Sequence, residues 1–138
     1  MKTWLMDTGP FVAYLNRTDP MHEPVVERFD EFAGQLVTTS AVITEVMYFL
    51  SDAPDGPLSF AEMLVASEIH VAESAQPPRV VAAARLMAKY ADTPMDFADA
   101  TLVLLADELG VVDVATLDTR GFSTYRTAKG KAFRLVLS

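Results

Sequence analysis

The sequence predicts an α/β fold in which helices cover both faces of a parallel sheet. Short apolar segments of strand length alternate with longer segments of helical periodicity along the whole chain. The strand candidates carry few polar residues, as is typical of parallel strands that are buried on both faces. The 138 residues contain no repeat, low-complexity stretch or long linker, so we expect residues 1–138 to form a single domain.

The first half of the chain is interpreted as two strand–helix units and a loop. A short apolar run ends at Asp7-Thr8-Gly9-Pro10, which is typical of a turn that starts a helix. Apolar residues from Val25 to Phe32 recur at helical spacing, and Gly34 follows as the expected C-terminal cap. The expected elements are a strand at 2–6, helices at 11–15 and 20–33, a strand at 36–38, a helix from Thr39 or Ser40 to about Leu50, and a loop at 51–57.

Strand and helix candidates also alternate in the second half of the chain, where Pro and Gly mark the helix ends clearly. Pro77-Pro78 opens a helix, Asp92-Thr93-Pro94 ends it, and Gly110 stops the helix that follows. The expected elements are a helix at 59–66, a strand at 69–72, helices at 78–91 and 96–109, and strands at 111–117 and 133–137.

Composition excludes several classes of protein. The chain has no Cys, which rules out disulfide scaffolds, thiolate metal sites and Cys nucleophiles. No apolar run approaches the roughly 20 residues of a membrane span, and the start is too short for a signal peptide. We therefore expect a cytoplasmic protein without a membrane segment. The net charge of −8 argues against a nucleic-acid coat, although all residues beyond Asp118 lack acids and include five of the 11 Lys and Arg.

Four acids interrupt otherwise apolar segments and are the candidates for a site. Asp7 and Asp118 each end a predicted strand, at the sheet edge where α/β proteins bind ligands. Glu45 is the only charge between residues 32 and 51, and we expect its helix face, with Ala41, Val42, Tyr48 and Phe49, to point inward. Asp99 shares a predicted face with Leu102, Val103 and Ala106, opposite Thr101 and Glu108.

Each acid also has a purely structural interpretation. Asp7 and Asp118 could bond the backbone amides of their turns, and Glu45 could lie on a helix surface. Asp96 is first of all an expected N-cap, with Asp99 at the N3 position of a capping box, and only second a participant in the site. Thr116 could lend a hydroxyl to the site or could simply pack within its strand.

Converging carboxylates repel one another and need a counter-charge. Few basic residues lie near these motifs, and His22 and His70 lack the spacing of metal ligands. Oxygen ligands alone select hard ions, so the pattern favours Mg²⁺ or Mn²⁺. A site of this kind suits hydrolysis of phosphodiester bonds by an activated water.

The same motifs resemble those of PIN-domain ribonucleases, in particular the VapC-like toxins of VapBC toxin–antitoxin pairs. The resemblance spans nearly the whole chain. It rests on Leu5-Met6-Asp7-Thr8-Gly9-Pro10, Ser40-Ala41-Val42-Ile43-Thr44-Glu45-Val46, Asp96-Phe97-Ala98-Asp99-Ala100-Thr101-Leu102, and Ala115-Thr116-Leu117-Asp118 followed by Gly121-Phe122. Gly9-Pro10 departs from the Asn or Ser that many relatives carry, so a polar side chain is lost there.

The resemblance implies a three-layer sandwich with a parallel sheet of about five strands. The implied activity is that of a Mg²⁺- or Mn²⁺-dependent endoribonuclease that cuts structured RNA such as tRNA or rRNA. The resemblance further implies that the protein is the toxin of a toxin–antitoxin pair, forms a homodimer and is blocked by a cognate antitoxin. The implied catalytic and metal-binding residues are Asp7, Glu45, Asp99 and Asp118, with Asp96 beside them. Candidate RNA contacts are Thr8, Thr116, Arg120 and Arg126.

Other functions fit less well. Phosphatases with an Asp after the first strand need a second Asp two residues later, where this chain has Gly9. A phosphoacceptor receiver domain needs an acidic pair after that strand, and no Gly-rich phosphate loop is present. The alternative that stays open is a catalytically silent PIN fold that binds RNA or protein.

Overall fold

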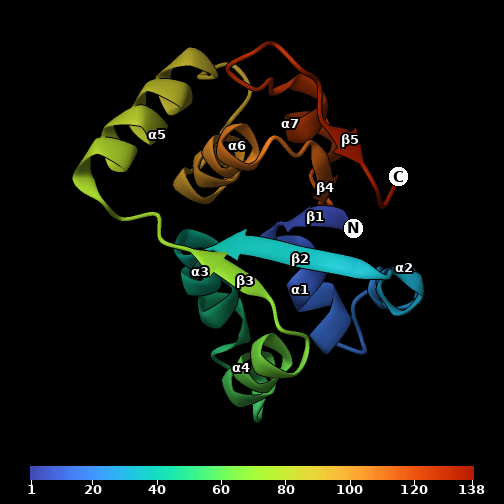
Figure 1. Cartoon of the computed structure of the whole chain (residues 1–138). Coiled ribbons are helices and arrows are strands. Elements are labelled where there is room, and N and C mark those ends of the chain that lie inside the picture. Colours follow the sequence, from blue (N-terminus) through green and yellow to red (C-terminus); the bar gives the residue numbers. More distant parts are fainter.

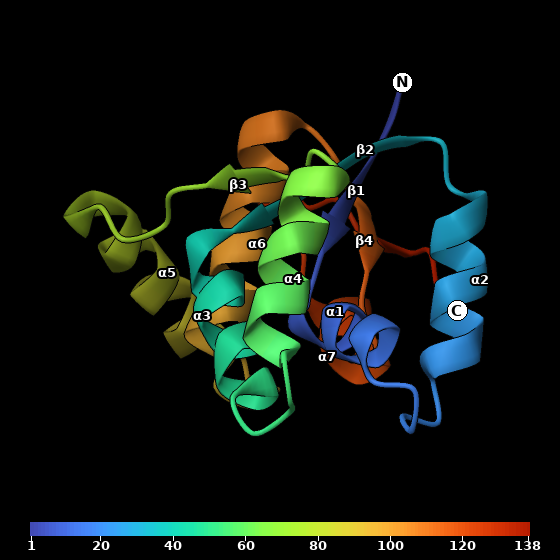
Figure 2. The same cartoon turned by 90° about the horizontal axis from the view of Figure 1, so that it is seen from below.

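A five-stranded parallel sheet with helices on both faces forms the protein. The computed structural model describes residues 1–138. Figures 1 and 2 show α1, α3 and α4 on one side of the sheet and α5, α6 and α7 on the other. The predicted three-layer α/β fold is therefore confirmed. The elements are β1 (Lys2–Met6), α1 (Thr8–Leu15), α2 (His22–Glu31), β2 (Gly34–Thr39), α3 (Ser40–Leu50), α4 (Gly56–Ala66), β3 (His70–Ala72), α5 (Pro77–Lys89), α6 (Phe97–Leu109), β4 (Asp113–Ala115), α7 (Thr119–Thr124) and β5 (Arg134–Leu135).

The strand order β3-β2-β1-β4-β5 places β1 at the centre of the sheet. The chain moves outward from β1 to β2 and β3, and then returns to the other side of β1 for β4 and β5. Ligands of open α/β sheets bind at such a reversal, beyond the carboxyl ends of the strands. Residues that directly follow β1 and β4 therefore lie at the expected binding edge.

Helix α6 is buried on nearly all sides, because it lies against the sheet and is covered by α5 (Figure 1). The side of α6 opposite Asp99 is buried at Thr101, whose hydroxyl donates a hydrogen bond to the Ala98 carbonyl and pairs with the Thr39 hydroxyl at 2.8 Å. Glu108 does face solvent and forms an ion pair with Arg79 of α5. Thr101 is therefore buried together with a polar partner, Thr39, at the end of β2.

Several predicted boundaries need correction. Strand β4 covers only residues 113–115 of the predicted 111–117, and helix α7 was not predicted. Helix α7 is only six residues long, too short for apolar periodicity to reveal it. No helix has both the length and the apolar character that crossing a membrane requires.

Gly34 does not cap α2, contrary to the prediction. Helix α2 ends at Glu31 with Phe32 as its C-cap in an extended conformation, and Gly34 begins β2. A Cβ on Gly34 would collide with the backbone oxygen of Lys2 and lie 2.6 Å from the Phe32 ring. Glycine is required here by the close approach of β1 to β2.

Replacing Gly34 with Ala is therefore expected to lower the free energy of unfolding by about 1–3 kcal/mol, because the two strands must separate locally. Urea titration followed by circular dichroism measures this difference. Gly130→Ala is a matched comparison in a turn with open space around the new Cβ, although its φ of 81° adds backbone strain. An unchanged midpoint in Gly34→Ala would contradict the packing argument.

Candidate active site

Asp7 follows β1 directly and is held from two sides. It is the N-cap of α1, and its Oδ1 accepts a hydrogen bond from the Thr8 amide at 2.8 Å. Its Oδ2 accepts from the Thr116 hydroxyl at 2.7 Å. Burial raises the pKa of Asp7 from 3.8 to about 6, although these two hydrogen bonds act in the opposite direction. Asp7 thus bonds the backbone of its turn, as the structural interpretation predicts, and it also lies close to other acids.

Glu45 lies on α3, and its carboxylate lines the same cleft as Asp7, which is described below. The Thr8 hydroxyl donates to Glu45 Oε1 at 2.6 Å. Burial raises the pKa of Glu45, and the nearby charge of Asp96 raises it further. The predicted inward face needs correction: Val42, Val46 and Leu50 are buried, whereas Tyr48 and Phe49 are 74% and 58% exposed.

Asp96 and Asp99 form the predicted capping box at the start of α6. Asp96 Oδ1 accepts from the Asp99 amide at 2.8 Å, and Asp99 Oδ2 accepts from the Asp96 amide at 3.2 Å. Asp99 is buried, and this burial together with the charges of Asp7 and Asp96 raises its pKa to about 8. The cap thus holds Asp99 in a place that disfavours its charged form.

Asp118 follows β4 and caps α7. Its amide donates to the Thr116 hydroxyl at 2.9 Å, and its Oδ1 accepts from the Gly121 amide at 3.0 Å. Thr116 therefore connects Asp118 to Asp7 through a single hydroxyl. A Cβ at Gly121 would collide with the Asp118 carboxylate, so glycine at this position leaves room for the acid.

These acids converge on one cleft of about 360 Å³. Six carboxylates line it and no Lys or Arg does: Asp7, Asp19, Glu45, Asp96, Asp99 and Asp118. Asp19, in the loop between α1 and α2, was not predicted, because nothing in its local sequence distinguishes it from a turn residue. As the side chains lie, no group of three or more acids or histidines is arranged to hold a metal ion. The cleft is a region of concentrated negative potential.

The hydroxyl of Thr116 is the link between β4 and the cluster. Thr116→Val removes the donor to Asp7 and the acceptor of the Asp118 amide while keeping the side-chain shape. We expect it to lower the free energy of unfolding by about 1–3 kcal/mol. Thr116→Ser, which keeps the hydroxyl, is the matched control. Thermal melting measures both, and equal losses in the two variants would assign the effect to the missing methyl group instead.

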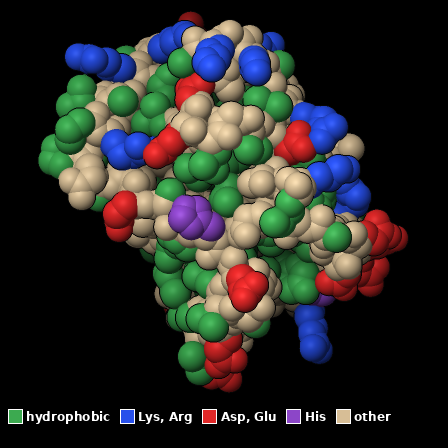
Figure 3. Space-filling model, in the orientation of Figure 1, with side chains coloured by type: hydrophobic (Ala, Val, Ile, Leu, Met, Phe, Trp, Pro, Cys, Tyr) green, Lys and Arg blue, Asp and Glu red, His purple; other side chains and the backbone are tan.

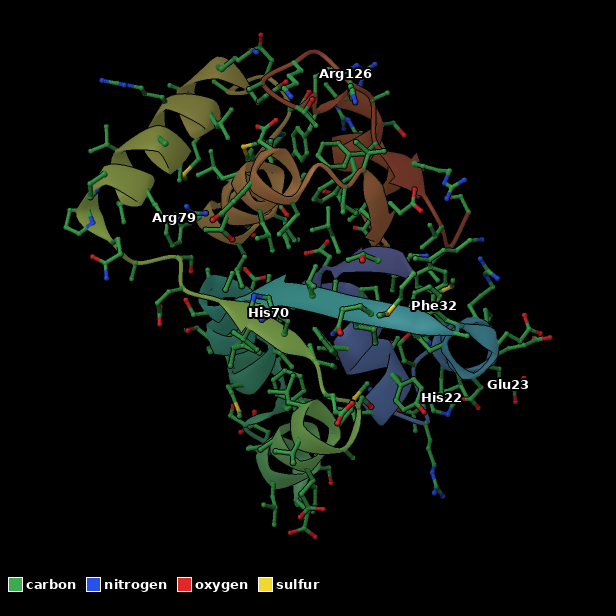
Figure 4. The ribbon with its side chains drawn as sticks, viewed as in Figure 1. His22, Glu23, Phe32, His70, Arg79 and Arg126 are labelled. Carbon is green, nitrogen blue, oxygen red and sulfur yellow. The ribbon has the colours of Figure 1, made fainter.

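The four candidate RNA contacts have different surroundings. Thr8 and Thr116 are buried, and their hydroxyls are used by Glu45 and Asp7. The Arg126 guanidinium bonds the carbonyl oxygens of residues 123–125 and lies beyond the end of α7 (Figure 4). Arg120 is exposed two residues after Asp118. Lys and Arg side chains also gather over α5 and the segment after α7 in Figure 3.

Neither histidine lines the acidic cleft. His22 and His70 lie on α2 and β3, well apart in Figure 4, and His22 Nδ1 is hydrogen-bonded to the Ala13 carbonyl.

The Tyr125 hydroxyl, which the sequence did not single out, donates a hydrogen bond to the Pro94 carbonyl at 2.8 Å. Burial and the neighbouring carboxylates raise the pKa of Tyr125, so this donor stays protonated and fixes the segment that leads into α6.

Known proteins share both the sequence pattern and this fold. A model of the PIN domain family matches residues 5–128. Ribonuclease VapC26 of Mycobacterium tuberculosis is 31% identical over 134 residues, which cover 96% of this chain and 98% of the relative.

Two solved structures share the fold at lower identity. One is Mycobacterium tuberculosis VapC20, described as a sarcin–ricin loop cleaving toxin, with a TM-score of 0.76, 16% identity and coverage of 86% and 91% of the two chains. The other is FitAB bound to a DNA fragment, with a TM-score of 0.68, 18% identity and coverage of 99% and 96%. The match to the family model and the identity to a full-length relative together show that the chain belongs to the PIN domain family, among its VapC-like ribonucleases.

Proposed function

We propose that the protein is the toxin of a toxin–antitoxin pair, an endoribonuclease that depends on Mg²⁺ or Mn²⁺. The observation that carries this proposal is the cleft in which six carboxylates meet without any basic residue. Such a concentration of like charge is unfavourable in the free protein and needs a cation for its charged form. The proposed catalytic and metal-binding residues are Asp7, Glu45, Asp99 and Asp118, with Asp96 beside them.

The chemistry of the donor set fits a hard divalent ion. All candidate ligands are carboxylate oxygens, which Mg²⁺ and Mn²⁺ prefer. Mg²⁺ usually keeps several waters and needs only one or two protein carboxylates, so a ready-made group of three ligands is not required. Asp7 and Asp99 are the strongest candidates, because burial and repulsion from neighbouring carboxylates raise the pKa of both.

When bound, the ion would lower the pKa of a water molecule and stabilise charge on the phosphate. The protein's own groups set the geometry around it. Thr116 fixes Asp7 and the start of α7, and Thr8 fixes one oxygen of Glu45. Burial and the nearby charge of Asp96 raise the pKa of Glu45, which favours a proton on this carboxylate, so Glu45 is the proposed proton acceptor.

RNA is the proposed substrate, and structured RNA such as tRNA or rRNA is the proposed class. The relative that is 31% identical is named a ribonuclease, and the structural neighbour VapC20 is described as cleaving the sarcin–ricin loop. The exposed Arg120 beside Asp118 is the proposed phosphate contact. Arg126 and Arg134 are less suited to that role, because Arg126 bonds backbone carbonyls and Arg134 forms an ion pair with Asp113.

We propose partners and placement on the same basis. A cognate antitoxin would cover the acidic cleft, and residues 1–138 would act as one domain in the cytoplasm. Val80 and Val81 on α5 are 39% and 50% exposed, so this helix offers an apolar face for a second copy in a homodimer.

Cleavage of pooled tRNA and rRNA by the partner-free protein tests the proposal. Mg²⁺, Mn²⁺ and EDTA are compared, with Asp118→Asn as the site variant. Glu108→Gln is the control, because this acid pairs with Arg79 outside the cleft. Discrete cuts that require metal, persist in Glu108→Gln and disappear in Asp118→Asn would support the proposal. Metal-independent cutting would contradict it, and RNA binding without cutting would favour the silent binding module.

A further inference from the structure

Two neighbouring aromatic side chains of α3 are exposed beside the acidic cleft. Tyr48 and Phe49 are 74% and 58% exposed, and their rings contact each other edge to face, with centroids 5.5 Å apart. The side of α3 that faces the core is supplied by Val42, Val46 and Leu50. The two rings are therefore not needed for the core of the protein, and such a pair of exposed rings indicates a binding surface.

The position of these rings relates them to the acids. Glu45, Tyr48 and Phe49 stand at positions i, i+3 and i+4, which share one side of a helix. Phe49 lines the acidic cleft together with Val12 and Leu117. Tyr48 lines an adjoining cavity of about 780 Å³, and Glu45 and Asp96 border both hollows. An RNA chain that leaves the acids toward this adjoining cavity would pass the two rings.

The charges around Tyr48 and Phe49 limit which chemical groups can bind over the two rings. Glu45, Glu73 and Asp96 line the cavity next to Tyr48, and neither hollow contains a Lys or Arg. Without a bound cation such a surface repels phosphates, whereas it does not repel the uncharged faces of bases. Bases stack on exposed aromatic rings regardless of sequence, and they can do so only where they are not stacked within a duplex.

We propose that Tyr48 and Phe49 form a stacking surface for unpaired bases next to the phosphate that is cut. This inference rests on the proposed ribonuclease function and narrows its substrate class to single-stranded segments, such as loops, within structured RNA. A second copy of the chain or a protein partner on the same surface is the competing occupant.

The test measures by fluorescence anisotropy how tightly the protein binds one labelled RNA of about 12 nucleotides with an arbitrary sequence. All variants carry Asp7→Asn, so that the probe stays intact, and Mg²⁺ is present. Tyr48→Leu and Phe49→Leu keep an apolar side chain but remove the ring. Tyr48→Phe and Phe49→Tyr keep the ring, and Leu58→Ala removes an exposed apolar side chain of α4. The same RNA annealed to its complement is the second probe.

Each Leu variant is expected to bind the unpaired RNA about 5- to 100-fold more weakly. The ring-preserving variants and Leu58→Ala should bind like the parent, and no variant should change the weak binding of the duplex. Equal affinity of parent and Leu variants for unpaired RNA would overturn the inference. So would a change from dimer to monomer in sedimentation without loss of RNA binding, because the rings would then cover a second copy.

The same variants without Asp7→Asn separate this inference from the function on which it rests. If the wild-type protein cuts pooled RNA and the Leu variants cut it equally well, only the stacking surface is wrong. If the wild-type protein cuts no RNA with either metal, the ribonuclease function itself fails.

Discussion

Asp7→Asn is expected to reduce RNA cleavage by at least a hundredfold while the protein remains folded. Asn has the size of Asp and keeps an oxygen for the Thr8 amide, but it carries no charge. Among the acids of the cleft, Asp7 is the one with hydrogen bonds to both of its carboxylate oxygens. Loss of its charge removes attraction for a cation at the centre of the cleft. The contact with the Thr8 amide can persist, whereas the new amide NH2 cannot accept from the Thr116 hydroxyl.

The rate of cleavage at saturating RNA and a fixed Mg²⁺ concentration measures this effect. Glu62→Gln is the control, since Glu62 lies exposed on α4, outside the cleft. Circular dichroism must show the same helix content for all three proteins. Cleavage by Asp7→Asn within a few-fold of wild type would remove Asp7 from the catalytic set and leave it as a helix cap.

The metal-free protein is expected to lose stability as pH rises from about 4 to 8. Asp7 and Asp99 have pKa values of about 6 and about 8 in the folded protein, above the ordinary 3.8. The folded state therefore binds protons more tightly than the unfolded chain, so unfolding releases protons and is favoured at high pH. For Asp7, the rise from 3.8 to about 6 corresponds to about 3 kcal/mol once the group is charged, or on the order of 10 °C in Tm.

Asp99→Asn provides the matched comparison for this pH dependence. Asn keeps an oxygen that can accept from the Asp96 amide, so the capping box can persist, but the carboxyl group that titrates near pH 8 is gone. The fall in Tm between pH 5 and 8 should be clearly smaller in this variant. Mg²⁺ or Mn²⁺ should raise the Tm of the wild-type protein at pH 8 and should raise that of Asp99→Asn less. Parallel pH curves for the two proteins would contradict the role assigned to Asp99.

Five of the six acids of the cleft could be predicted, because they interrupt an apolar segment or stand at the end or start of an element. Asp7 follows a strand, and Asp96 and Asp99 start a helix, so their positions depend on local signals that the structure confirms. Glu45 was predicted to line the site, yet the face assigned to its helix was wrong. Periodicity cannot distinguish rings that fill a core from rings, such as Tyr48, that line a cleft.

Features that depend on contacts between distant segments were not predictable. Gly34 resembles a helix cap in the sequence, but its role comes from the approach of β1. Thr116 was predicted as a possible hydroxyl donor or RNA contact, but its link to Asp7 was not, because the two residues are 109 positions apart. Asp19 reaches the cleft through the path of a loop, which no local pattern determines.

The most direct test of the proposed site is single-turnover cleavage of one purified RNA target across a titration of Mn²⁺, with wild type beside Asp99→Asn. If these carboxylates hold the ion that cuts RNA, wild-type cleavage is absent in EDTA and rises to saturation with Mn²⁺. The variant then needs on the order of tenfold more Mn²⁺ or more to reach half of its maximal rate, since a charged ligand is lost. Cleavage that persists in EDTA, or an identical Mn²⁺ dependence in the two proteins, would contradict the account.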